Sequence, residues 1–106
     1  MMTDTDRRIF EELAARLRGE YPRARVWAFG SRARGDAEPE SDFDVCVVLP
    51  RESHEDRRRI RHLAWEIAFD HGIVFNTMIF SDEAFNQGPL SESTLVSNIM
   101  REGVPA

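Results

Sequence analysis

A chain of 106 residues suits one domain with one hydrophobic core, and we expect residues 1–106 to form a single domain. Hydrophobic residues make up 42% of the sequence, which excludes a disordered tail, and no apolar run approaches the roughly 20 residues that span a bilayer. The net charge of −5 argues against binding to the phosphate backbone of nucleic acids. A charged, helix-patterned N-terminus and a lone Cys46 inside an apolar run predict a cytoplasmic protein without an internal disulfide.

The N-terminal third predicts a helix followed by a strand. Apolar residues recur at every fourth position through residues 5–18, which is typical of an amphipathic helix. Thr3 and Asp6 have capping-box spacing before that helix, and Gly19 is expected to end it. After a Tyr-Pro break, residues 24–29 predict a short strand that ends at a glycine.

The middle of the chain predicts a buried strand and a long helix. Residues 43–49 read FDVCVVL and are nearly all apolar, as expected of a strand that is covered on both faces. A proline ends this strand. The following helix is predicted over residues 53–71, with Ser53 and Asp56 at capping positions and Gly72 at its end.

A run of arginines marks the second predicted helix. Arg57, Arg58, Arg59 and Arg61 lie mostly off its apolar stripe. They form either a solvated helix face or a contact surface for an acidic partner, and the sequence leaves both interpretations open.

The C-terminal third completes an α-β-β-α-β-α order. A third strand is predicted over residues 73–80, followed by a helical turn that opens at residues 81–83. A loop over residues 88–93 then leads to a last helix over about residues 92–102, which Gly103 ends. This order predicts an α/β or α+β fold, with a small mixed β-sheet and flanking helices. The apolar third strand could lie at a sheet edge, where strands can pair between chains.

Two carboxylates stand at the start of the second strand, in the stretch GSRARGDAEPESDFD of residues 30–44. Strand alternation predicts that Asp42 and Asp44 share one side, about 6.6 Å apart along the strand. Such a pair can bracket divalent metal ions. Because the ligands are hard oxygens, they favour Mg²⁺ or Mn²⁺.

The same stretch opens with groups that suit phosphate binding. Gly30 lets the backbone approach a ligand closely, and the Ser31 hydroxyl with the following N–H groups can hold phosphate oxygens. The guanidinium groups of Arg32 and Arg34 lie within reach of the same anion. A Gly-Ser turn or an Asp-x-Asp pair is common loop chemistry when it occurs alone. Their combination offers both halves of a site for a nucleoside triphosphate that carries Mg²⁺.

The stretch GSRARGDAEPESDFDVCVVL resembles the signature of the minimal nucleotidyltransferases, members of the DNA polymerase β-like superfamily, with the pattern G-S-x-A-R-G-x(n)-S-D-x-D. The resemblance implies the nucleotidyltransferase fold of that superfamily, a small mixed sheet flanked by helices. It also implies that Gly30 and Ser31 hold the triphosphate and that Asp42 and Asp44 bind Mg²⁺. The implied reaction moves a nucleoside monophosphate, AMP from ATP, onto an acceptor hydroxyl and releases pyrophosphate.

The acceptor stays open, because the chain is too short to carry an acceptor-binding domain of its own. Family members of this size often work beside a helical protein of the HEPN type, an RNase-like toxin, and neutralise it by adding AMP. The resemblance therefore implies a toxin-antitoxin pair in which this chain is the antitoxin.

The third predicted strand departs from the family pattern. Active members usually carry a third carboxylate on this strand, which helps to bind the catalytic metal and to deprotonate the acceptor. Here the strand reads IVFNTMIF, and Asn76 is the candidate for that position. An amide can offer a metal its carbonyl oxygen but cannot take a proton at neutral pH. Asn76 could also simply hydrogen-bond a neighbour, and the chain could be a catalytically degenerate nucleotide-binding or protein-interaction module of the same fold.

Overall fold

The computed structural model describes residues 1–86 and 94–106. Every predicted helix and strand is present among them, and a five-residue helix and a two-residue strand are added. The predicted loop over residues 88–93 and the predicted start of the last helix lie outside the described residues. The elements follow in the order α1 Asp4–Glu20, β1 Arg25–Phe29, α2 Gly30–Arg34, β2 Phe43–Leu49, α3 His54–His71, β3 Phe75–Ser81, α4 Asp82–Asn86, α5 Thr94–Glu102 and β4 Val104–Pro105.

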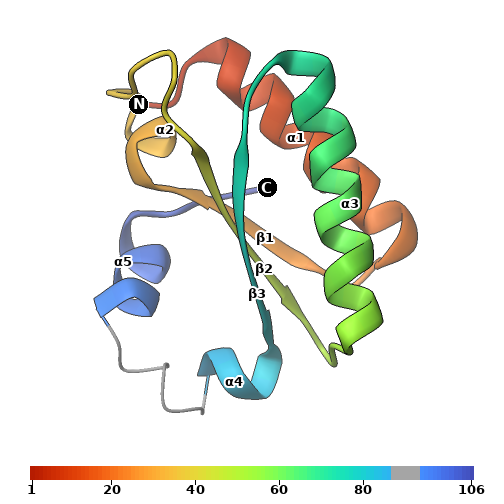
Figure 1. The fold of residues 1–106 in the computed structure, drawn as a ribbon. Helices are drawn as coiled ribbons and strands as arrows, with labels where there is room; N and C mark the ends of the chain where they lie inside the picture. Colours follow the sequence, from red (N-terminus) through yellow and green to blue (C-terminus); the bar gives the residue numbers. More distant parts are fainter. Residues whose placement is uncertain (87–93) are drawn as a thin grey trace.

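The strands form a mixed sheet in the order β3-β2-β1-β4. Strand β1 runs antiparallel to β2 and β4, whereas β2 and β3 are parallel and α3 makes the crossover between them. The predicted small mixed sheet with flanking helices is thereby confirmed. The prediction that the third strand lies at an edge is also confirmed (Figure 1).

Helices cover both faces of the sheet (Figure 1). Helices α1 and α3 pack on one face, where the side chains of Val45 and Val47 join their core cluster. Helices α4 and α5 pack on the other face against Cys46 and Val48. All four of these β2 side chains have no exposed surface, so β2 is covered on both sides as its apolar sequence predicts. None of the described helices combines the length and the apolar character needed to cross a bilayer.

The helix ends follow local chemistry, with one exception. Ser53 and Asp56 form the predicted capping box, and Gly72 ends α3 with a φ of +66°. The prediction that Gly19 ends α1 is wrong, because the helix continues to Glu20. The Tyr21 N–H still donates to the carbonyl of Leu17, and the proline that follows disfavours a further helical turn.

Cys46 gives the sheet interior a measurable pH dependence. Burial raises the pKa of its thiol to about 12, against about 8.5 in an unfolded chain. Above about pH 8.5 the unfolded chain releases a proton that the folded chain keeps, so the free energy of unfolding falls as pH rises.

We expect Cys46→Val to remove this dependence while keeping the core filled. Between about pH 8.5 and pH 10, the stability of the wild type relative to the variant should fall by up to about 1.4 kcal/mol per pH unit. Urea unfolding of both proteins across this range measures the difference. Equal slopes in the two proteins would contradict the assignment.

Candidate functional site

Three strand ends meet at one end of the sheet. Asp44, the second residue of β2, lies opposite Phe29, the last residue of β1, and opposite Asn76 of β3. Since Gly30 directly follows Phe29, the glycine and the asparagine flank Asp44 from the two neighbouring strands. The sheet register thereby brings Asp44 and Asn76 together, although they are 32 positions apart in the chain.

Each oxygen of the Asp44 carboxylate has a close neighbour from an adjacent strand end. The Asn76 amide nitrogen Nδ2 donates a hydrogen bond to Asp44 Oδ1 at 3.0 Å. On the other side, a Cβ atom at Gly30 would lie 2.3 Å from Asp44 Oδ2, and Gly30 has a φ of +73°. Position 30 therefore requires glycine both for its backbone conformation and for space.

Asp42 lies in the loop just before β2 and is exposed, whereas Asp44 is half-buried. In residues 1–86 and 94–106, no three His, Cys, Asp or Glu side chains form a group that could hold a metal ion. A metal bound here would rest on two carboxylates and on ligands from a substrate. That composition suits Mg²⁺, which is often held by one or two carboxylates together with substrate phosphates. Because Asn76 donates to Asp44 through its nitrogen, its carbonyl oxygen remains available as a further hard ligand.

Ser31 stands on the short helix α2, directly after the glycine. Its backbone carbonyl accepts hydrogen bonds from the N–H groups of Gly35 at 2.9 Å and Asp36 at 3.1 Å. Its half-buried hydroxyl makes no hydrogen bond with any residue that the structure describes. The hydroxyl is therefore available to a ligand beside Gly30, while the backbone around it is held in place.

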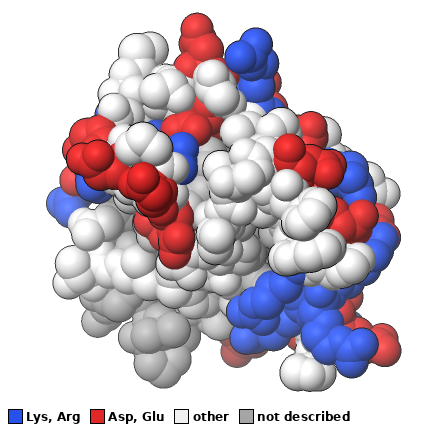
Figure 2. All heavy atoms as spheres, turned by 45° about the horizontal axis from the view of Figure 1, so that its top comes forward, with Lys and Arg blue, Asp and Glu red and all other residues white. Residues whose placement is uncertain are grey.

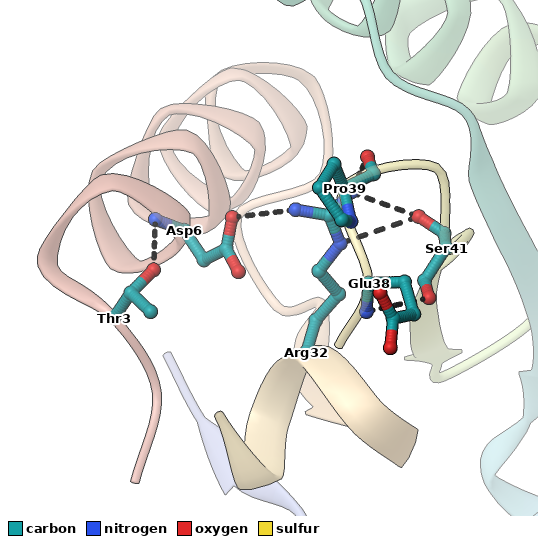
Figure 3. A network of polar contacts seen from close by, with 6 residues as sticks. All are labelled: Thr3, Asp6, Arg32, Glu38, Pro39 and Ser41. Carbon is teal, nitrogen blue, oxygen red and sulfur yellow. Dashed lines mark hydrogen bonds and ion pairs between the residues drawn. The ribbon is translucent and has the colours of Figure 1, made fainter. Parts of the chain in front are cut away.

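Arg32 is buried and joins three parts of the chain (Figure 3). Its Nη1 contacts the Asp6 carboxylate of α1 at 3.0 Å. Its Nη2 donates to the carbonyl oxygens of Pro39 at 3.1 Å and Ser41 at 2.9 Å, and its Nε also donates to Ser41. The guanidinium thus fixes the loop that leads to Asp42. A phosphate contact by Arg32 stays a prediction.

Arg34 is exposed and lies closer to an open surface. Its side chain pairs with Asp36 at 3.3 Å, a contact in which both side chains are more than half exposed. Together with Gly30 it lines a recess of about 110 Å³ between α2 and α5. Because an exposed ion pair is weak, Arg34 can leave Asp36 for a stronger anion at little cost.

Acidic side chains crowd the loop between α2 and β2. Four of its residues are exposed acids, namely Asp36, Glu38, Glu40 and Asp42. Figure 2 shows a cluster of acidic side chains on the left of the molecule, and arginines with further acidic side chains among them on the right. A free triphosphate would be repelled by this loop, and a divalent cation between the phosphates and the carboxylates would offset that repulsion.

Sequence reasoning missed the partner of Arg32. The Thr3 hydroxyl does accept the predicted hydrogen bond from the Asp6 N–H, at 3.1 Å. The carboxylate of the same residue pairs with Arg32, twenty-six positions away. Helix periodicity could have placed Asp6 near the sheet but gave no signal for that pairing.

Comparison with known proteins identifies the family of this chain. The profile of the "Nucleotidyltransferase domain" family matches residues 7–102. This chain belongs to the nucleotidyltransferase domain family. A protein of Methanocaldococcus jannaschii with the name "Putative protein adenylyltransferase" is 32% identical over 75 residues, which cover 71% of this chain and 69% of that protein.

A solved structure supports the fold of this nucleotidyltransferase. The crystal structure of a protein from Sulfolobus solfataricus, titled as a putative nucleotidyltransferase, superposes with a TM-score of 0.50 at 16% identity. The superposition covers 96% of this chain and 82% of the other. The chain thus has the fold of a nucleotidyltransferase and belongs to a family of enzymes that act on nucleoside triphosphates.

The Arg32–Asp6 pair predicts a large stability effect. Their side chains are only 11% and 8% exposed, so Arg32→Met leaves a buried carboxylate without its partner and should cost about 3 kcal/mol. The double variant Arg32→Met with Asp6→Ala should lose less than the two single losses added together, because no unpaired charge remains.

The control is the exposed pair, in which Arg34→Met should change stability by no more than about 0.5 kcal/mol. Urea unfolding of the wild type, Arg32→Met, Asp6→Ala, the double variant and Arg34→Met measures these free energies. An Arg32→Met protein as stable as the wild type would show that the pair does not hold the loop.

Proposed function

We propose that this nucleotidyltransferase moves AMP from ATP, with Mg²⁺ or Mn²⁺, onto a hydroxyl group of an acceptor protein. The adenylyl group and the protein acceptor are supported by the name of the Methanocaldococcus relative. A helical HEPN-type toxin is the acceptor that the resemblance to minimal nucleotidyltransferases implies, and this chain would then act as its antitoxin.

One observation carries the proposal. The half-buried Asp44 is held between Asn76 and the close-packed Gly30, and the next residue in the chain is Ser31, whose hydroxyl makes no hydrogen bond with any described residue. This arrangement supports a role for the turn in phosphate binding, beside a fixed carboxylate at one end of the sheet. The positive φ of Gly30 and its close contact with the Asp44 carboxylate are the features of this turn that support the proposal.

The residues divide into two groups by role. Gly30 and Ser31 would bind the triphosphate, and Arg34 would leave Asp36 to contact it. Asp42 and Asp44 would hold the metal ion, which supplies neutralisation of the charge on the phosphate oxygens. The described contacts of Arg32 give it a positioning role through the loop.

The reaction forms one bond and breaks one. The acceptor oxygen bonds to the α-phosphorus, the bond from that phosphorus to the bridging oxygen breaks, and pyrophosphate leaves with the bonding electron pair. The amide of Asn76 cannot accept the hydroxyl proton, so that proton passes to water, to a base on the acceptor or to one of the two aspartates.

Labelled ATP tests the transfer. With Mg²⁺ and a HEPN-type partner, we expect label on the partner, and a loss of at least about 100-fold in Asp42→Asn and Asp44→Asn, because each removes a charge that positions the triphosphate. Asp70→Asn is the charge-matched control, since Asp70 is exposed at the end of α3. The thermal midpoint should rise only when ATP and Mg²⁺ are both present. Such a rise without label on the partner would point to a binding module.

A variant at Asn76 tests whether the chain is an active enzyme or a catalytically degenerate family member. We expect Asn76→Asp to leave transfer unchanged or to lower it, because the variant loses the amide hydrogen bond to Asp44 and places two carboxylates side by side. Asn86→Asp on α4 adds the same charge at an exposed position and serves as the control. A strong gain of transfer in Asn76→Asp, measured with the same label, would identify the native chain as degenerate.

A further inference from the structure

The edge strand β3 and the helix beside it form an uncovered apolar surface. Trp65 and Phe69 of α3 are 59% and 72% exposed, and Val74, just before β3, is 60% exposed. A groove of about 690 Å³ runs between α3 and β3. Large apolar side chains gathered in this way on one surface mark an interaction site.

The open side of β3 also presents unpaired backbone groups. The carbonyl of Val74 accepts a hydrogen bond from Phe43 at 2.8 Å and therefore points toward β2. Because N–H and C=O directions alternate along a strand, Phe75, Thr77 and Ile79 point their backbone groups to the free side. Strand β3 reads FNTMIFS and carries no charge and no proline, the usual devices that prevent pairing at an edge.

We propose that a second copy of this chain pairs here, β3 against β3, antiparallel about a two-fold axis. The two four-stranded sheets then become one continuous sheet, and Trp65 and Phe69 of each copy pack against the other copy. A second copy supplies a strand of the same length with the same free groups. This dimer does not depend on the proposed adenylyl transfer.

The charges of α3 favour a second copy over an unrelated partner. Of the four arginines in its first half, residues 54–62, Arg57 and Arg59 form ion pairs with Glu52 and Glu20, whereas Arg58 and Arg61 form none with any residue that the structure describes. Its second half, residues 63–71, carries two carboxylates, Glu66 and Asp70, a net charge of −2. An antiparallel pair sets each half beside its opposite in the other copy. A uniformly acidic segment would suit the first half and be repelled by the second.

The aromatic side chains supply a substantial part of the area that a dimer needs. If each offers about 200 Å² in full, their exposed fractions amount to roughly 260 Å² per copy. A standard interface buries about 800 Å² per partner, so the two rings provide about a third of it. The strand edge and the aliphatic stem of Arg61 extend the same surface.

Molar mass in solution tests the proposal. We expect light scattering after size exclusion to give twice the 12.2 kDa of one chain, and to give a single chain for Trp65→Glu with Phe69→Glu. Met100→Glu, at a position on α5 that is 57% exposed, should keep the dimer and controls for the added charge. A wild type that stays monomeric at high concentration overturns the proposal, as does a double variant that stays dimeric.

Hydrogen exchange locates the contact and separates this dimer from any other. The amides of Phe75, Thr77 and Ile79 should exchange slowly in concentrated solution and faster on dilution. Those of Asn76 and Met78, which face β2, should not depend on concentration. Equal behaviour of the two sets, read by NMR, would overturn strand pairing even where a dimer forms.

Discussion

The buried guanidinium of Arg32 is the constraint on which the geometry of the site depends. It contacts the carboxylate of Asp6 on α1 and two carbonyls of the loop before β2, and it lies over the ring of Phe43 at 5.9 Å. One planar group thus links the first helix, α2 and the start of the central strand. The loop contributes exposed acids and little apolar surface, so these contacts, rather than hydrophobic burial, fix where it enters the sheet. The point at which the loop joins β2 sets the positions of Asp42 and Asp44.

Asn76 gives the site its individual character. In the sheet register it lies directly beside Asp44, the position that suits a further metal-binding oxygen. A carboxylate there would face Asp44 as a like charge until a cation bound, whereas the amide donates a hydrogen bond to it. An amide at this position therefore orders the site without metal and offers no proton acceptor. At position 76 an amide holds Asp44 in place but cannot accept a proton, whereas a carboxylate could accept a proton but would repel Asp44.

The sequence predicted much of this fold because the relevant forces are local. The FDVCVVL stretch is nearly all apolar, as expected of a strand that is covered on both faces. Ser53 and Asp56 mark the start of α3 through contacts between residues three positions apart. The pairing of Arg32 with Asp6 and the two-residue β4 depend on contacts between distant segments, which no local pattern encodes. At the site, glycine, serine and the two aspartates were found from their spacing. The contact between Gly30 and Asp44 emerged only when the register of two strands was known.

The hydrogen bond between Asn76 and Asp44 also has a genetic consequence. Asparagine and aspartate codons differ by a single transition in the first base, so the amide and the acid are neighbours in the genetic code. Both side chains have nearly the same shape, and position 76 is exposed enough to admit either one without repacking the interior. One base change in this gene can therefore replace the asparagine, which orders the site, with an aspartate, which can accept a proton. Natural selection can test that replacement repeatedly.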